Sequence, residues 1–435
     1  MRVFILCLVS MVLSVPGFAH APQSEDMKFV TTWNEFALDS IRQRRIVPPL
    51  AVQYLAAMHL AMFEAANRSS GSYLSLMNVP VESSPGNLQL QRLQTAAAAF
   101  RVLKDFAPPG IQEKAAQTLQ EESLVTTLPE EMKLNAMEEA YRLSDRIISE
   151  RLTDPGTTSP SQTFPVGPGY WVPTPPLQGP YLLPGWGRLQ PWILEKGEAL
   201  RPLGPPALNS AAYAAALDEV RRLGSKNSTE RTAEQTETAF FWADGAGTST
   251  PPGHWNTILK DHLAQCDNDL VEITRIHAIL NMAMADACIA AWDSKWHFYF
   301  WRPITAIREA NQDGNPFTEP DPSWESLLDT PPFPAYVSGH AAVSGTAAVV
   351  LTDFFQDRLP SVRVTSEVVP VVRQYPDFAA AAHDAARSRV YGGIHYEFDG
   401  QDGLHLAQSL GQVYHAQALP PRPGSKAAAA GRVCR

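Results

Sequence analysis

The chain has 435 residues, of which 45% are hydrophobic and 18% are charged, and its formal net charge is -10. This length and composition provide enough apolar material for one large globular unit or two fused ones. The acidic balance argues against nucleic acid as a partner, because phosphate backbones attract basic surfaces. Any site for an anion must therefore be a local cluster of positive charge.

The first 21 residues are typical of a secretory signal peptide. Arg2 provides a short positive region, residues 3–15 are apolar, and an A-x-A sequence that fits a cleavage site ends at Ala21. A membrane anchor is the alternative, but the apolar run is too short to span a bilayer. We therefore expect a secreted or periplasmic protein that starts near Pro22 and has no membrane association after cleavage.

Three cysteines follow the signal peptide, Cys266, Cys288 and Cys434, so at most one disulfide can form within the chain. Cys266 and Cys288 are the better pair if they lie on neighbouring elements, but the spacing does not decide the pairing. The sequence also leaves open whether the protein forms a homo-oligomer.

Residues 22–153 are expected to form a helical N-terminal region. Apolar residues recur there at three- and four-residue steps, most clearly in 54–67, 90–103 and 134–152. Residues 154–208 are instead rich in Pro and aromatic side chains, which blocks regular helix. This segment is expected to be irregular, to wrap a helical core and to frame the mouth of a pocket.

Helical patterns return in residues 209–420, which form the expected catalytic region. The stretch 254–302 contains no Gly or Pro and predicts two helices with a break near 266–269, where Asn or Asp can cap the second. Further helices are expected over 335–355, 378–389 and 402–417. The tail, 421–435, is expected to be disordered. The predicted fold class is all-α, with two packed four-helix-type bundles and long irregular Pro-rich connections.

Three short segments in the last third of the chain carry the chemistry. In the first, KWHFYFWRP, Lys295 and Arg302 are seven residues apart, so on a helix they project from nearly the same face. The bulky apolar residues between them would bury this helix and desolvate both cations, which strengthens their attraction to an anion. A Lys and an Arg on a solvated face are the alternative for this segment alone.

The second segment is Ser338-Gly339-His340, between a Pro-rich stretch and an apolar helical run. The N-terminus of a helix offers free backbone N–H groups, to which Ser338 adds a hydroxyl. Gly339 lets the backbone approach a ligand closely. His340 would then lie on the first turn, in a position for acid–base chemistry. A capping Ser beside an incidental His is the alternative.

The third segment, SRVYGGIH, contains Arg389 and His395. Arg389 can bind an oxyanion through two parallel N–H groups. Asp399 follows His395 by four residues, so its carboxylate can hold the ring N–H and fix the tautomer, unless it is an ordinary surface residue. Three cations in one pocket are costly without an anion to balance them. Phosphate and its structural analogue vanadate are the expected ligands.

The order K-x6-R-P, S-G-H and S-R-x5-H resembles the signature of the vanadium-dependent haloperoxidases. These enzymes share their site with acid phosphatases of the type 2 phosphatidic acid phosphatase superfamily. The resemblance covers about residues 240–410 and implies an oxyanion-binding shell of Lys295, Arg302, Ser338, Gly339 and Arg389. It also implies that His395 is the axial ligand of vanadium or the nucleophile of a phosphatase. His340 would be the acid–base residue, and Lys295 would polarise bound peroxide.

The resemblance extends to positions around the pocket. Trp292 and Phe333 match apolar positions of the fungal chloroperoxidase type, whereas bromoperoxidases commonly have a His where Phe333 stands. Residues 241–256 look like a family segment, in which Asp244 would pair with a site arginine. Val337 departs from the pattern, because a proline usually precedes Ser-Gly-His. The loop loses a fixed φ but no catalytic group.

The resemblance implies an oxidoreductase with a vanadate cofactor, which oxidises halide with hydrogen peroxide to a hypohalous-acid-type species and acts on an organic acceptor. The alternative is an acid phosphatase without a bound cofactor, which would form a phospho-histidine intermediate at His395. A non-enzymatic oxyanion-binding helical protein is a third possibility, in which His340 and His395 would be idle. The chain has no HExxH, paired CxxC, GxSxG or P-loop motif, so it gives no signal for a zinc site or for those other catalytic classes.

Overall fold

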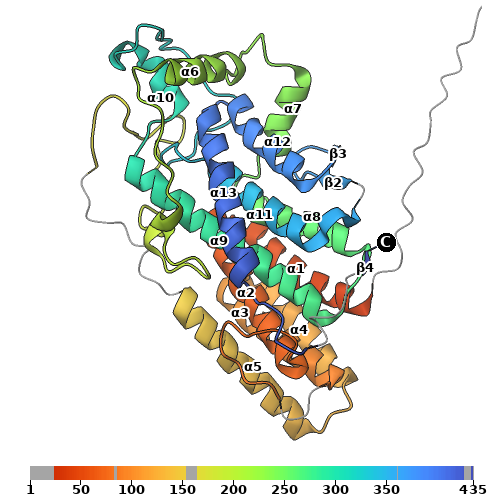
Figure 1. Ribbon diagram of the computed structural model, residues 1–435. Helices are drawn as coiled ribbons and strands as arrows, with labels where there is room; N and C mark the ends of the chain where they lie inside the picture. Colours follow the sequence, from red (N-terminus) through yellow and green to blue (C-terminus); the bar gives the residue numbers. More distant parts are fainter. Residues whose placement is uncertain (1–23, 83–85, 153–163, 360, 426–432, 435) are drawn as a thin grey trace, which may run out of the picture.

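Figure 1 shows the computed structural model, which describes residues 24–82, 86–152, 164–359, 361–425 and 433–434. Nearly all of the regular structure in these residues is helical, so the prediction of an all-α fold is confirmed. The predicted signal peptide, residues 1–21, lies outside the described residues.

The N-terminal bundle, coloured red to yellow in Figure 1, is centred on one buried helix. Its members are α1 (Glu25–Arg44), α2 (Pro48–Ser70), α3 (Leu88–Phe106), α4 (Pro109–Val125) and α5 (Glu130–Arg151). Helix α2 is apolar on nearly all sides and is therefore buried, between α3 and α5 of its own bundle and α9 of the next. Proline in the first turn of α2 and of α4 is well tolerated, because the N–H it lacks would have no helical partner there.

The second bundle is built around α9, which runs through the centre of the molecule (Figure 1). It comprises α8 (Thr250–Leu263), α9 (Leu270–Phe298), α11 (Gly339–Phe355), α12 (Phe378–Tyr391) and α13 (Glu397–Gln417). Among the described helices only α9 is long and apolar enough to cross a membrane, and it is almost entirely buried against α2, α11 and α13. The predicted break near 266–269 is confirmed, because Asp269 caps α9 by accepting a hydrogen bond from the backbone N–H of Glu272.

Shorter elements surround these bundles. They are α6 (Ala211–Leu223), α7 (Ala233–Phe241), α10 (Pro303–Arg308) and the 3-10 turns Trp186–Arg188, Gly197–Leu200, Ala310–Gln312 and Gln356–Arg358. Two antiparallel ribbons, which the sequence did not predict, pair β2 (Val362–Thr365) with β3 (Val372–Tyr375) and β1 (Cys266–Asp267) with β4 (Val433–Cys434). The prediction of a disordered tail over 421–435 fails for its described part. The reasons are the β1–β4 pairing and a hydrogen bond from the backbone N–H of Arg422 to the oxygen of Ser72.

The described part of the Pro-rich segment is irregular and is tied to α9 by one buried carboxylate. Asp286 of α9 accepts hydrogen bonds from the backbone N–H groups of Trp192 at 2.6 Å, Ile193 at 3.0 Å and Leu194 at 2.9 Å. It also accepts the hydroxyl of Tyr414 on α13 at 2.9 Å. This buried carboxylate therefore fixes the course of the segment across the second bundle.

The two cysteines favoured as a pair do not bond to each other. Cys266 is disulfide-bonded, whereas Cys288 is free and buried in α9. The preference for a Cys266–Cys288 bridge is therefore wrong. The physical reason is distance, because Cys288 lies about 27 Å along α9 from the start of that helix, beside which Cys266 sits in β1.

Candidate active site

The first motif does not form one continuous helix. Helix α9 ends at Phe298, Tyr299 adopts a left-handed conformation with φ 53°, and Arg302 is the extended residue that precedes α10. Pro303 accounts for this, because the residue before a proline is disfavoured in helix. The prediction that Lys295 and Arg302 share a helix face is therefore wrong. Both side chains are nevertheless fully buried, and both lie over the ring of Phe333, at 5.0 and 4.8 Å from its centroid.

Lys295 connects α9 to the loop that precedes the second motif. Its Nζ donates to the backbone oxygens of Pro334 at 3.1 Å and Ala335 at 2.9 Å, and to that of Val337. An ammonium group has three N–H donors, so these three oxygens use them all. Burial and the nearby Arg302 guanidinium hold the pKa of Lys295 well below its usual range. In this geometry Lys295 would act on an anion through its charge and through the loop that it holds.

Ser338 and His340 form the start of α11, as the sequence predicted. The Ser338 hydroxyl accepts a hydrogen bond from the backbone N–H of Ala341. The backbone N–H of Ser338 donates to the backbone oxygen of Asp399 at 2.9 Å. Gly339 faces Trp292, where a Cβ atom would lie 3.3 Å from the indole ring. The imidazole Nε2 of His340 is buried without a hydrogen-bond partner in the protein.

The electrostatic environment keeps His340 neutral near pH 7. Burial, followed by the charge of Arg389, holds the pKa of His340 well below its usual value, and a hydrogen bond to the backbone of Trp242 only partly offsets this. The ring thus presents a free nitrogen, which can accept a proton from a bound ligand.

His395 and Asp399 are in direct contact. The imidazole Nδ1 lies 2.7 Å from a carboxylate oxygen of Asp399, which also accepts the backbone N–H of Tyr396. Helix α13 begins at Glu397, so this contact crosses the start of the helix rather than lying within one of its turns. The carboxylate fixes the N–H on Nδ1, which leaves the lone pair on Nε2. The predicted spacing therefore brings the two side chains together.

The two arginines of the motifs are both buried near the histidines. Arg302 donates from Nε to the oxygen of Phe333 and from Nη1 to the oxygen of Ile394, and Nη1 also lies 3.0 Å from Nε2 of His395. Its Nη2 is buried without a protein partner. Arg389 is held by the backbone oxygen of Trp242, among others. Burial lowers the pKa of Arg302 to about 9 and that of Arg389 to about 10, so both remain charged at neutral pH.

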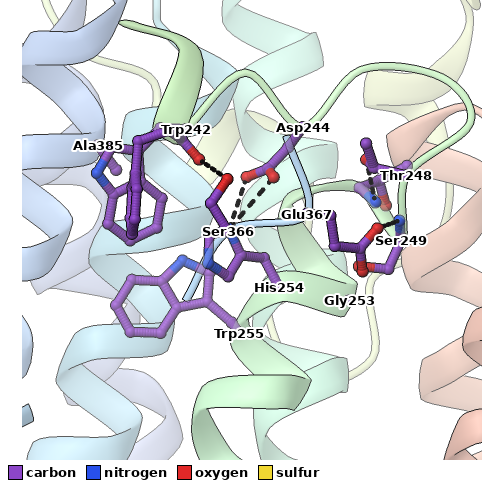
Figure 2. Close-up of polar contacts among 12 residues, drawn as sticks. Trp242, Asp244, Thr248, Ser249, Gly253, His254, Trp255, Ser366, Glu367 and Ala385 are labelled. Atoms are coloured by element: carbon purple, nitrogen blue, oxygen red, sulfur yellow. Dashed lines mark hydrogen bonds and ion pairs between the residues drawn. The ribbon is translucent and has the colours of Figure 1, made fainter. Parts of the chain in front are cut away.

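Asp244 faces the cavity from the loop after α7 and bonds to a histidine rather than to an arginine. Figure 2 shows its carboxylate pointing at His254 of α8, with carboxylate oxygens 3.0 and 3.2 Å from Nδ1. The other ring nitrogen of His254 lies 2.6 Å from the backbone oxygen of Thr365. Asp244 was predicted to pair with a site arginine. It attracts Arg389 electrostatically, but no direct hydrogen bond joins the two side chains. The sequence signal for His254 was only its position ten residues after Asp244.

Several of these residues line one cavity of about 510 Å³, whereas Lys295, Arg302 and Ser338 are buried outside its lining. Its floor includes Arg389, Gly339 and the two histidines, His340 and His395. Its walls include Trp292 and Phe333, the two residues that the resemblance assigned to the pocket. Their ring centroids are 5.0 Å apart. Leu177 and Leu182 of the Pro-rich segment also line it, in agreement with the expected role of that segment. The wall also includes Arg45 from the connection between α1 and α2, and Pro48 and Pro49 from the start of α2, which were not foreseen.

Comparisons with known proteins agree with this geometry. A profile for the VCPO second helical-bundle domain matches residues 275–420. The vanadium chloroperoxidase of Curvularia inaequalis is 33% identical over 184 residues, 36% of this chain and 30% of the relative, so the chain matches less than a third of that protein. The crystal structure of a bacterial vanadium-dependent iodoperoxidase superposes with a TM-score of 0.80 and 26% identity, over 92% of this chain and 99% of that one. The chain is therefore similar to vanadium-dependent haloperoxidases, in sequence over residues 275–420 and in fold over most of its length.

A second solved structure supports the fold. The holo-type bacterial vanadium-dependent chloroperoxidase has a TM-score of 0.68 at 16% identity, over 85% of this chain and 92% of that one.

The similarity to haloperoxidases raises the question of whether vanadate fits the residues present. Buried polar atoms without partners are rare in proteins, yet Arg302 Nη2 and His340 Nε2 both lack one. An oxyanion that accepts from the guanidinium and shares a proton with His340 would satisfy both, so the donor set fits vanadate.

Proposed function

We propose that this chain is a vanadate-dependent haloperoxidase, which oxidises halide with hydrogen peroxide. The observation that supports this best is the imidazole of His395, which Asp399 orients through Nδ1 and which lines the same cavity as His340 and Arg389. One fixed imidazole ligand with a positive surround is suited to a metal oxyanion. The similarity to a bacterial vanadium-dependent iodoperoxidase over 92% of the chain supports the same activity.

The proposed reaction consumes one hydrogen peroxide, one halide ion and one proton, and releases one hypohalous acid and one water. Vanadate, when bound, supplies a Lewis-acidic centre that activates peroxide without changing its own oxidation state. His395 would hold it through Nε2, while Asp399 keeps the other ring nitrogen protonated. Arg302 and Arg389 would balance its negative charge. His340, kept neutral by burial, would accept the proton of the incoming peroxide and return it to the leaving oxygen.

Export of the protein is part of this proposal. The sequence of residues 1–21 suggests a cleaved signal peptide, and the disulfide at Cys266 suits an oxidising compartment such as the periplasm or the extracellular space. N-terminal sequencing of protein recovered from the periplasm or medium tests this directly, with a start near Pro22 as the expected result. Recovery of only full-length protein from the cytoplasm would contradict export.

The activity is tested by loading the purified chain with orthovanadate and measuring oxidation of iodide, bromide and chloride by hydrogen peroxide. We expect turnover that requires vanadate and falls by about a thousandfold or more in His395→Ala, because the ligand to the catalytic centre is lost. His383→Ala is the matched control, since His383 is an exposed histidine on α12 outside the cavity, and it should retain activity.

The acid phosphatase alternative uses the same residues and is measured in parallel. Hydrolysis of a phosphomonoester by the vanadate-free chain, inhibited by vanadate and accompanied by no halide oxidation, would overturn the haloperoxidase proposal. Halide oxidation without significant phosphomonoester hydrolysis would support it. The comparisons favour the haloperoxidase, because a solved structure that matches over 92% of the chain is a bacterial vanadium-dependent iodoperoxidase.

A further inference from the structure

The cavity is larger than peroxide and halide require. Its volume is about 510 Å³, whereas a water molecule occupies about 30 Å³ in the liquid. Pockets for small organic ligands have volumes of about 300–1,000 Å³. The space above His340 and His395 can therefore admit an organic molecule in addition to the small inorganic substrates.

The walls of the cavity are apolar and rigid. Six prolines line it in three adjacent pairs from separate parts of the chain, Pro48, Pro49, Pro251, Pro252, Pro331 and Pro332. Proline has a fixed φ and no N–H donor, so these pairs offer preformed apolar surfaces and few backbone donors. Trp292 and Phe333 add flat aromatic surfaces next to the floor. Such walls favour a ring or another compact apolar group over a highly hydroxylated one.

Arg45 is a cationic residue on the solvent-exposed part of the cavity lining. It directly follows α1, and its side chain has no hydrogen bond or ion pair among the described residues. Gly247 allows the loop after α7 to lie against it, because a Cβ atom there would be only 2.7 Å from Nη1 of Arg45. The exposed acidic residue of the lining is Asp329, whereas Asp244 is buried against His254.

We propose that this cavity is the binding site for the organic acceptor, and that the acceptor is a small aromatic compound with an anionic group such as a carboxylate. Its anion would pair with Arg45, its ring would lie between the proline pairs, and its reactive carbon would face His340. This inference rests on the proposed haloperoxidase function. Hypohalous acid would transfer its halogen to that carbon, a C–H bond would give way to a C–halogen bond, and the released proton and hydroxide would form water.

The test compares 4-hydroxyphenylacetate with its neutral amide, 4-hydroxyphenylacetamide, which share the same phenol ring. Dissociation constants are measured by calorimetry on the full-length chain in orthovanadate buffer, so that the oxyanion site is filled. We expect the anion to bind about five times more tightly than the amide, as one partly exposed ion pair allows. Arg45→Ala should abolish this preference, and Arg45→Lys should restore part of it.

Two further variants serve as controls for charge. Arg44 is the adjacent exposed arginine, contacts the backbone oxygen of Phe106 and does not line the cavity, so Arg44→Ala should keep the preference. Asp329→Ala removes the like charge from the lining and should increase the preference for the anion. Equal affinity for both compounds in the unaltered chain, or a preference that Arg45→Ala leaves unchanged, would overturn the inference.

Binding and turnover separate this inference from the proposed function. Absence of halide oxidation together with an Arg45-dependent preference would refute the haloperoxidase proposal and the acceptor role, because the site would then bind the anion for another purpose. Halide oxidation with identical kcat/KM for both phenols, in the unaltered chain and in Arg45→Ala, would refute the acceptor site alone. Support requires that the ratio of the two kcat/KM values also falls by about fivefold in Arg45→Ala.

Discussion

The contacts of its two ring nitrogens favour the protonated form of His254. One lies beside the carboxylate of Asp244 and the other beside the backbone oxygen of Thr365, and both of these groups only accept hydrogen bonds. An imidazole donates from both nitrogens only when it is protonated. Burial alone would lower the pKa of His254, but Asp244, the backbone oxygen of Thr365 and Glu367 together outweigh it and raise the pKa above the usual value. The charge of Asp244 is thus shared between His254 and Arg389, which lines the same cavity.

Replacement of His254 is expected to weaken binding of the oxyanion. In His254→Gln the carboxylate of Asp244 would lose its positive partner and neutralise more of the charge of Arg389. We predict a dissociation constant for orthovanadate about ten- to a hundredfold higher, which is the range for residues that support a metal site indirectly. Calorimetric titration of the folded variant with orthovanadate measures this. A dissociation constant equal to that of the unaltered chain would show that His254 serves only the packing of α8.

His262 provides the matched control for that experiment. It is a second buried histidine of α8, it bonds to the backbone oxygen of Ile258, and it has no contact with Asp244. His262→Gln should therefore leave vanadate affinity unchanged while it lowers stability by about 1 kcal/mol. If both variants lose affinity equally, the loss reflects α8 as a whole.

At this scale the sequence predicts contacts between residues that are close along the chain. The contact between His395 and Asp399, which are four residues apart, could be predicted, and so could the Ser338 cap of α11. Both depend only on local backbone geometry. The carbonyl partners of Lys295 could not be predicted, since they lie about 40 residues away on a loop whose course depends on the rest of the fold. Nor could the sequence predict that Asp244 would bond to His254 rather than to an arginine.

At the scale of elements, Asp286 links α9 to the Pro-rich segment. Its carboxylate accepts three consecutive backbone N–H groups and the hydroxyl of Tyr414. Burial raises the pKa of Asp286 to about 6, although these hydrogen bonds stabilise the ionised form. The segment has no helix or strand of its own at this point, so its backbone donors depend on that one side chain.

We expect Asp286→Asn to loosen the Pro-rich segment. An amide has one acceptor oxygen in place of two, so at least one buried N–H would lose its partner, at a cost of about 3 kcal/mol in the free energy of unfolding. Urea denaturation gives the stability, and limited proteolysis followed by mass spectrometry gives the site of new cleavage, which should fall near residues 186–194. Cleavage elsewhere, or unchanged stability, would contradict the role given to Asp286.

Asp293 supplies a control on the same helix. It pairs with Arg201, and both side chains are partly exposed to solvent. Asp293→Asn should lower the free energy of unfolding by only about 1 kcal/mol, because partly exposed ion pairs contribute little. The helix over 270–298 was predictable from a stretch without Gly or Pro and a capping residue near 266–269. The attachment of Asp286 to the Pro-rich segment was not, because an Asp inside a helix gives no sign of which loop it will bind.

Across the whole molecule, the two bundles meet where α2 packs on α9, and two buried histidines are stacked in that contact. The rings of His59 and His277 have centroids 4.9 Å apart. Burial lowers the pKa of His277 from 6.5 to about 4, and it holds that of His59 well below its usual value. Both rings are therefore neutral in the folded protein at neutral pH.

The folded protein should lose stability as the pH falls from about 6.5 towards 4. In that window the unfolded chain binds protons at these histidines and the folded chain does not, so the stabilisation present above pH 6.5 is lost on acidification. For His277 the difference amounts to about 3 kcal/mol. Urea unfolding at pH 7 and pH 4.5 measures it, and His277→Leu should reduce the change between the two pH values. An equal change in the unaltered chain and in His277→Leu would show that His277 is not the source of the acid sensitivity. Asp286 cannot be that source, because its raised pKa stabilises the folded protein as the pH falls.

The proline pairs of the cavity wall also bear on how long such a catalyst would survive its own product. Hypohalous acids attack amide N–H groups and thiolates, and proline in a chain has no N–H to attack. Cys288 also lines the cavity, and burial raises its pKa to about 12, which keeps the sulfur in the less reactive thiol form. The six prolines thus leave fewer backbone N–H groups in the lining for the product to attack, which favours more turnovers before self-inactivation.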